Sequence, residues 1–135
     1  MVKSLAIDCQ VEKLKDIRLF IDNFLNEISV SDELRNLLVL AVDEVCANVI
    51  IHSQRLDSSK TLEVKVYYQP GNLIFEILDS GLPFDPTSIT EPSLSNIISE
   101  KRKGGLGLML VRRIMDSIET VRENDKTIYR LIKNI

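Results

Sequence analysis

The sequence contains little of what defines several common classes of protein. It has 135 residues, with two cysteines, one histidine and no tryptophan. Because Cys9 and Cys46 form no Cys-x-x-Cys pair, they indicate reduced structural thiols rather than a disulfide framework or a redox site. A single histidine leaves little basis for a zinc site. No apolar run approaches the roughly 20 residues of a membrane span, and no signal-peptide pattern opens the chain, so we expect a cytoplasmic protein.

The chain also lacks a strong excess of positive charge. Its formal net charge is −3, which disfavours direct binding of nucleic acid, because such proteins usually carry a basic face. A local basic cluster does occur at Lys101-Arg102-Lys103. The hydrophobic content is 44%, which is enough for a core without metal or disulfide support. We expect residues 1–135 to form a single domain.

Hydrophobic periodicity predicts a two-layer α+β sandwich. Alternating apolar residues indicate strands, and apolar residues spaced by three and four indicate helices. The expected strands are Lys3–Asp8 at an edge, Thr61–Gln69, Leu73–Leu78, Glu119–Arg122 and Thr127–Ile132. The expected helices are Val11–Ile28, Asp32–Ser53 with Ser31 as its N-cap, and Leu106–Ser117. This order predicts a mixed, mostly antiparallel sheet with helices on one face.

One connection stands apart from the other loops. The segment from Pro83 to about Lys103 is polar and is interrupted by Pro86 and Pro92. It is long for a simple connection in a compact domain, and loops of that kind are usually functional or disordered.

The first of three polar motifs lies on the second predicted helix, which is apolar nearly all round and is therefore expected to be buried on most sides. Glu44 and Asn48 are four residues apart and share a face, with apolar neighbours such as Leu40 and Ile51. Since burying an unpaired carboxylate is costly, Glu44 either pairs with a basic residue or serves a function. The functional interpretation is a Mg²⁺ ligand at Asn48 with Glu44 beside it as a base. His52 extends the row and is interpreted as a polar capping or supporting residue.

The second motif follows the Leu73–Leu78 strand and reads Asp79-Ser80-Gly81-Leu82-Pro83-Phe84-Asp85-Pro86. A carboxylate at the mouth of a pocket, here Asp79, can accept a hydrogen bond from the exocyclic amine of adenine. Gly81 has no Cβ and allows a ligand to approach the backbone closely. The alternative is an ordinary Asp-Ser-Gly turn.

The third motif, Gly104-Gly105-Leu106-Gly107, opens the last predicted helix. Helix N-termini present free N–H groups and the positive end of the dipole, which favour a phosphate. The basic cluster Lys101–Lys103 adds charge at the same place, and the alternative is a flexible hinge. No Gly-Lys-Ser/Thr follows, which excludes a P-loop, and no strand leads directly into the glycines, which excludes a Rossmann fingerprint.

With these three motifs in order, the chain resembles the GHKL ATPase superfamily and, within it, the small bacterial anti-sigma-factor serine kinases. Glu44-x-x-x-Asn48-x-x-x-His52 is similar to the N-box of that superfamily, and Gly105-Leu106-Gly107-Leu108 to its G2 box. Asp79–Pro86 is similar to the G1 box, with the Pro-Phe-Asp-Pro extension typical of the anti-sigma branch. The resemblance covers nearly the whole chain and implies a Bergerat ATP-binding fold in the bacterial cytoplasm.

The resemblance also implies a role for each matching residue. Glu44 would be the catalytic general base, Asn48 would hold Mg²⁺ against the phosphates, and residues 83–103 would form an ATP lid. Other nucleotide-binding positions are Asp79, Gly81 and Thr127 near adenine and Gly105, Leu106 and Gly107 at the phosphates, with Lys103 added from its charge alone.

By this resemblance the chain would bind ATP or ADP with Mg²⁺ and act as a serine/threonine-protein kinase. It would sequester a sigma factor and phosphorylate a serine of a STAS-like anti-sigma-factor antagonist, with a homodimer possible and no direct nucleic-acid or membrane partner. One alternative is a non-catalytic switch that binds nucleotide and a partner without transferring phosphate. A second alternative is an interaction domain whose pocket no longer binds nucleotide.

Overall fold

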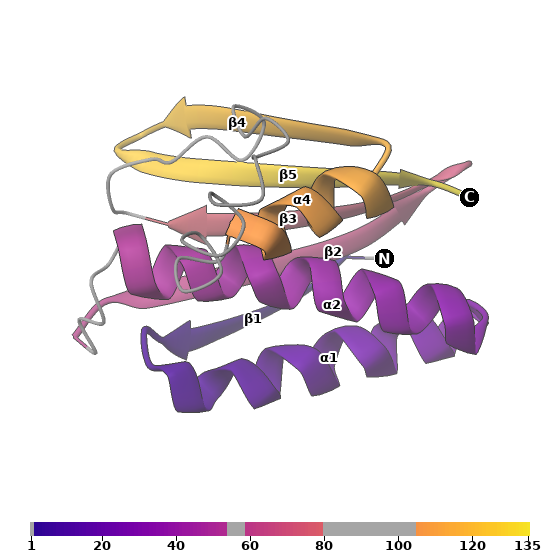
Figure 1. The fold of residues 1–135 in the computed structure, drawn as a ribbon, viewed down its shortest axis with the longest axis horizontal. Helices are drawn as coiled ribbons and strands as arrows, with labels where there is room; N and C mark the ends of the chain where they lie inside the picture. The colour runs from indigo at the N-terminus through magenta and orange to yellow at the C-terminus, as the bar shows by residue number, and fades with distance from the viewer. Residues whose placement is uncertain (1, 54–58, 80–104) are drawn as a thin grey trace.

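The computed structural model describes residues 2–53, 59–79 and 105–135, which form two layers (Figure 1). The strands are β1 (Val2–Asp8), β2 (Thr61–Gln69), β3 (Asn72–Asp79), β4 (Ser117–Glu123) and β5 (Lys126–Asn134). The helices are α1 (Leu14–Glu27), α2 (Asp32–Asn48) and α4 (Gly105–Ile114). A 3₁₀ turn, η1 (Val11–Lys13), leads into α1, and a π-helical turn, η2 (Val49–Ser53), extends α2. All predicted strands and helices are present, and the predicted lid at residues 83–103 lies outside the described residues.

The sheet has the strand order β1-β2-β3-β5-β4, and each of its four ladders is antiparallel. Parallel pairing, which the prediction of a mixed sheet allowed, is not found in the described stretches. The chain crosses the sheet twice, in α1 and α2, before β2 begins, so β2 runs opposite to β1 (Figure 1). β5 separates β3 from β4, so these two strands do not pair directly.

Two tight turns set the register of the hairpins. Gly71 has a φ of +85° in the β2–β3 turn, where it follows Pro70, the arrangement that a type II turn requires. Asn124 and Asp125 have φ values of 51° and 62° in the β4–β5 turn. Two consecutive positive φ values are the mark of a type I′ hairpin, and Asn and Asp tolerate them better than most residues.

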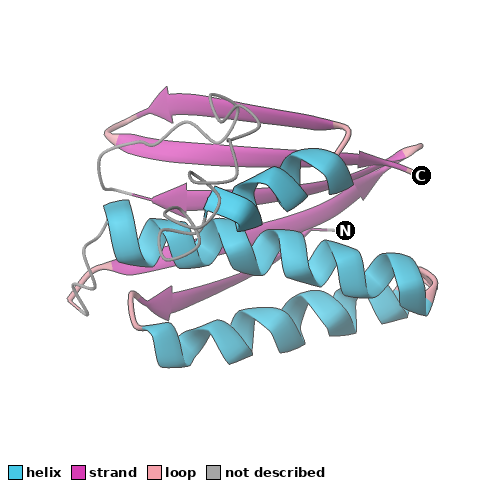
Figure 2. Ribbon diagram, viewed as in Figure 1, coloured by secondary structure: helices cyan, strands magenta, loops and turns pink. Residues whose placement is uncertain are grey.

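The three helices cover one face of the sheet and leave the other face open (Figure 2). The buried side chains between the layers come from every helix and from the central strands, and include Ile17, Phe24, Leu38, Phe75 and Tyr129. Ser31 begins α2 as predicted, because its Oγ accepts a hydrogen bond of 3.3 Å from the backbone N–H of Leu34.

Two details differ from the sequence prediction. α4 ends at Ile114, three residues before the predicted Ser117, because the N–H of Asp116 donates to Ile132 of β5 and Ser117 already pairs in the sheet. α2 was expected to be buried on most sides, yet Leu37 is 46% exposed and Leu40 is 37% exposed. The apolar row around Glu44 is therefore partly a surface rather than core.

Candidate functional site

Three polar side chains lie buried in the core of the described part of the chain. They are Asn48, which is 4% exposed, and Asp79 and Thr127, which are fully buried. Placing polar groups in a core costs free energy unless they are bonded or serve a ligand. All three positions were predicted from the sequence as nucleotide-binding residues, and they come from three different elements.

Asp79 and Thr127 lie side by side. Asp79 is the last residue of β3, Thr127 is the second residue of β5, and the two are directly paired in the antiparallel ladder. Residues paired across a ladder point to the same face of the sheet, and here it is the face that carries the helices. The carboxylate and the hydroxyl therefore stand next to each other at one end of the sheet.

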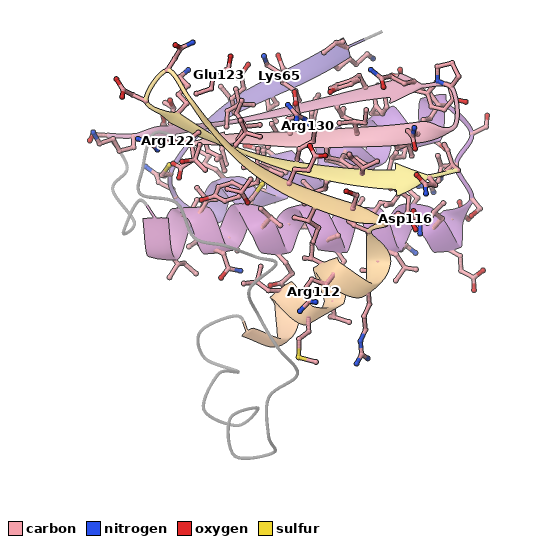
Figure 3. All side chains as sticks on the ribbon, turned by 90° about the horizontal axis from the view of Figure 1, so that it is seen from above. Lys65, Arg112, Asp116, Arg122, Glu123 and Arg130 are labelled. Atoms are coloured by element: carbon pink, nitrogen blue, oxygen red, sulfur yellow. The ribbon has the colours of Figure 1, made fainter. Side chains whose placement is uncertain are left out.

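A third polar side chain joins this pair from the edge strand. Arg122 of β4 is paired in register with Thr127, and its Nη1 donates a 2.7 Å hydrogen bond to Thr127 Oγ1. Figure 3 shows Arg122 at the same end of the sheet as the β4–β5 turn. Sequence reasoning missed this residue because no motif marks it. The tight Asn124-Asp125 turn was the available signal, since it places the residue five before Thr127 directly opposite it.

Asn48 ends α2 with its amide held in one orientation. Its Nδ2 donates a 2.8 Å hydrogen bond to the backbone carbonyl of Glu44, one turn earlier. Since a carbonyl can only accept, this bond assigns Nδ2 and presents Oδ1 on the other side, the atom suited to Mg²⁺. The helix then changes to the π-helical turn η2, a feature that is frequent at functional sites. His52 lies in η2, and its side chain is outside the described set.

Glu44 is half-buried on α2, one turn before Asn48. Burial raises the pKa of Glu44, and the neighbouring carboxylate of Asp43 raises it further. Asp43 itself pairs with Arg18 of α1, whose Nη1 lies 3.0 Å from its Oδ1. Within the described residues no cation pairs with Glu44, so the predicted alternative of an ion-paired glutamate finds no partner there.

The third polar motif begins α4. Gly105, Leu106 and Gly107 are its first three residues, and the helix packs against α2. Its first turn lies beside the C-terminal half of α2 (Figure 1). The free N–H groups of a helix start can bind phosphate oxygens. Gly81 and the cluster Lys101–Lys103 lie outside the described residues.

The elements that carry these residues converge at one end of the molecule. The C-terminal end of α2, the end of β3 and the start of β5 lie together on the left of Figure 1. A surface hollow of about 480 Å³ lies elsewhere, at the start of α2, and is lined by Ser31, Glu33, Leu34, Asn36 and Leu37. None of the predicted site residues lines that hollow, so the buried polar side chains are the better guide to the site.

The chemistry of this donor set fits a magnesium nucleotide. Asp79 and Thr127 offer an acceptor and a hydroxyl to a base, Asn48 offers a neutral oxygen to a metal ion, and Glu44 offers a basic carboxylate.

Among the described residues, none of the helices has both the length and the apolar character that a membrane span needs.

Comparison with known proteins places the chain in a family. Residues 7–133 match the model of the histidine kinase-like ATPase domain, so the chain belongs to that family. The family binds ATP, usually with Mg²⁺. The fold and the ordered motifs thus define a GHKL-type ATPase domain, as the resemblance of the sequence predicted.

The chain is also similar to curated proteins that are named serine kinases or anti-sigma factors. The chain is 27% identical over 94 residues to the serine/threonine-protein kinase BtrW of Bordetella bronchiseptica, covering 70% of this chain and 66% of that protein. It is 25% identical over 135 residues to the serine-protein kinase RsbW of Halalkalibacterium halodurans, covering 96% and 80%. It is 24% identical over 109 residues to the anti-sigma F factor of Clostridium perfringens, covering 81% and 78%.

Solved structures confirm the fold. The RsbU and RsbW domains of Rv1364c from Mycobacterium tuberculosis align with a TM-score of 0.70 at 15% identity, over 99% of this chain and 32% of that chain. The SiaB protein in the SiaB–SiaC complex from Pseudomonas aeruginosa aligns with a TM-score of 0.62 at 11% identity, over 98% and 89%. The chain spans about a third of the mycobacterial protein, so that likeness concerns one part of a longer chain.

Proposed function

We propose that this chain is a Mg²⁺-dependent protein serine kinase of the anti-sigma type. It binds ATP, transfers the γ-phosphate to a serine of a STAS-like antagonist, and sequesters a sigma factor when the antagonist is phosphorylated. The observation that carries the proposal is that the buried polar side chains of the described residues are Asn48, Asp79 and Thr127. These are positions that the family resemblance assigns to the nucleotide, and they gather at one end of the fold.

Each residue has a definite task in this proposal. Asp79 accepts a hydrogen bond from the adenine amine, with Thr127 beside it, and Gly81 would line the base pocket as the family resemblance implies. Gly105, Leu106 and Gly107 direct backbone N–H groups at the phosphates, and Lys103 adds positive charge. Asn48 would hold Mg²⁺ through Oδ1, and the ion would supply positive charge against the phosphates when bound.

Glu44 acts on the incoming serine. Its carboxylate takes the proton from the serine hydroxyl while the serine oxygen forms a bond to the γ-phosphorus and the bond to the β-phosphate oxygen breaks, so ADP leaves. A general base works best when its pKa is not far below the working pH. Burial and Asp43 raise the pKa of Glu44 in that direction, which supports this role.

The remaining predictions belong to the same proposal. Residues 1–135 act as one domain in which residues 83–103 close over the nucleotide as a lid. The names of two relatives, serine-protein kinase RsbW and anti-sigma F factor, support a sigma factor and its antagonist as the protein partners. A homodimer is a further part of the proposal, and sedimentation of the purified chain tests it directly.

A phosphotransfer assay tests the kinase. Purified STAS-domain proteins from the same organism are incubated with the chain and Mg-ATP, and phosphoserine is located by mass spectrometry. The expected result is one phosphorylated serine on one antagonist, and transfer to none of these proteins would contradict the kinase proposal. Glu44→Gln should lose transfer, whereas Glu33→Gln, a matched change at an exposed position of the same helix, should keep it.

The second candidate is a nucleotide-dependent switch without phosphotransfer. The hydrogen bond from Asn48 Nδ2 to the Glu44 backbone favours it, because the metal ligand is oriented without use of the Glu44 side chain. In that case ADP or ATP binds and stabilises the chain, by about 2.7 kcal/mol at a hundredfold excess over Kd, but no phosphoserine forms. A binding assay run beside the transfer assay separates the two functions. An absence of nucleotide binding would instead support an interaction domain.

A further inference from the structure

We infer that Arg122 determines the base selectivity of this site, by holding the Thr127 hydroxyl so that it donates to N1 of adenine. This inference rests on the proposed nucleotide site and adds to it a residue that no motif marks. Arg122 acts here as a positioning residue, since it reaches the base through Thr127.

The first step is the geometry across three strands. Asp79 on β3, Thr127 on β5 and Arg122 on β4 are consecutive partners in the two ladders. Arg122 Nη1 lies 2.7 Å from Thr127 Oγ1, and Thr127 is fully buried. Arg122 itself sits on an exposed edge strand, where water could satisfy its guanidinium. One of its contacts is nevertheless a short, charge-assisted hydrogen bond to a buried hydroxyl.

The second step is the direction of the hydrogen bonds. A guanidinium carries only donors and stays protonated, so in this pair Thr127 Oγ1 must accept. A hydroxyl that accepts through one lone pair still has its own hydrogen to donate. Arg122 thereby fixes the side from which Thr127 accepts and directs the hydroxyl hydrogen elsewhere. The carboxyl group of Asp79 next to it offers an acceptor oxygen.

The third step matches this pattern to a base. From β3 to β5 the site presents an acceptor, Asp79, followed by a donor, Thr127. The Watson–Crick edge of adenine presents the complementary order, with the N6 amine as donor and N1 as acceptor. Guanine presents O6 as acceptor and N1–H as donor, which would face like against like at both positions. A site whose buried groups stay unpaired with the wrong base discriminates strongly against it.

The experiment measures how much N1 of the base contributes to the affinity of the chain for the nucleotide. Binding of Mg-ADP is compared with binding of 1-deaza-ADP, in which a C–H replaces N1, by titration calorimetry. For the unaltered chain we expect 1-deaza-ADP to bind about tenfold more weakly, the usual effect of losing one hydrogen bond at a buried partner. In Arg122→Met the ratio should fall to about twofold, because Thr127 is free to turn. Arg122→Lys, which can still donate to Oγ1, should restore part of the discrimination.

Arg130→Met is the matched control. Arg130 lies on the neighbouring strand β5, points to the open face of the sheet and forms ion pairs with Glu76 and Glu119, so its loss removes an equal side chain from the same region. This variant should keep the tenfold ratio. Thermal unfolding without nucleotide checks that each variant is folded, and the ratio is a readout that a purely structural role of Arg122 would leave unchanged.

Each outcome bears on a different statement. Full discrimination retained in both Arg122→Met and Arg122→Lys would overturn the inference while leaving the nucleotide site intact. Equal binding of ADP and 1-deaza-ADP by the unaltered chain would also overturn it, because Thr127 would then not donate to N1. A lack of ADP binding by the unaltered chain would overturn the proposed function and this inference together.

Discussion

Polar side chains have different surroundings on the two faces of the sheet. On the helix-covered face Asn48, Asp79 and Thr127 are buried, Asn48 donates to the backbone carbonyl of Glu44, and Thr127 accepts a hydrogen bond from Arg122. On the open face the register aligns Lys65, Glu76, Arg130 and Glu119 in one row across four strands. Lys65 and Arg130 are labelled on that face in Figure 3.

Three charged side chains of the open-face row, Glu76, Arg130 and Glu119, pair with one another. Arg130 Nε lies 2.7 Å from Glu76 Oε2, and its Nη1 lies 3.0 Å from Glu119 Oε2. The bonds to these two carboxylates raise the pKa of Arg130, so it remains charged under all ordinary conditions. Such cross-strand pairs contribute modestly to stability. The polar groups of the open face stabilise the fold through ion pairs, whereas the buried polar groups of the other face are the ones that we propose bind a nucleotide.

Glu44→Gln should produce the largest effect. Loss of a general base lowers rates by on the order of 10²- to 10⁴-fold, so phosphate transfer to the antagonist should fall by that factor. ADP affinity should stay within about twofold, because the Glu44 backbone carbonyl still orients Asn48. Rates come from single-turnover transfer and affinities from calorimetry. A variant that transfers phosphate at the original rate would remove Glu44 from the chemistry and favour the switch.

Asp79→Asn should be next in size. The amide keeps the shape of the side chain but replaces one acceptor oxygen with an NH₂ donor. Because this donor cannot accept a hydrogen bond from the adenine amine, ADP affinity should fall by about 100-fold. Glu76→Gln, the same chemical change on the same strand but on the open face, should leave ADP affinity unchanged. Equal losses in the two variants would show that the two faces do not differ as described.

Arg130→Met should affect stability alone. Removing an arginine that bridges two partly exposed carboxylates should lower the free energy of unfolding by about 1 kcal/mol. Nucleotide affinity should not change, since the row lies on the far face of the sheet. Denaturant unfolding with and without ADP measures both quantities. A change in affinity would couple the two faces.

The smallest effect concerns pH. Burial, and to a lesser extent the charge of Asp43, hold the pKa of Glu44 above its ordinary value of 4.5. In a plot of transfer rate against pH, the rate should therefore begin to fall at a pH above 4.5 as the solution becomes more acidic. Asp43→Asn removes the like charge and should move this fall to lower pH. The raised pKa also means that folded Glu44 holds its proton more tightly than unfolded Glu44, so its contribution to stability falls as pH rises through this range. Glu44→Gln should accordingly stabilise the chain at neutral pH, as thermal unfolding can show.

Most of the fold could be predicted because its signals are local. Alternation marked β2, helical spacing marked α1, Ser31 as an N-cap marked the start of α2, and the turn at residues 123–126 marked the β4–β5 hairpin. The end of α4 was wrong because a tertiary bond, from Asp116 N–H to Ile132, ends the helix before its own pattern does. The exposure of Leu37 and Leu40 was also missed, because apolar composition alone does not say which side of a helix is covered.

The residues of the candidate site also differ in whether a local sequence pattern marks them. Asn48 and Asp79 could be predicted because motifs carry them, and Thr127 followed from the family resemblance. Arg122 could not, because its contact with Thr127 depends on the register between two strands rather than on a spacing along the chain. The roles of all these residues remain predictions that binding and transfer experiments can test.

The most direct test of the central claim is calorimetric titration of the unaltered chain with Mg-ADP and, separately, with Mg-GDP. We predict saturable binding of one ADP per chain and binding of GDP that is at least about tenfold weaker, because the guanine edge presents an acceptor to Asp79 and a donor to Thr127. Failure to bind ADP, or equal affinity for the two nucleotides, would contradict the account of the buried polar side chains as an adenine site.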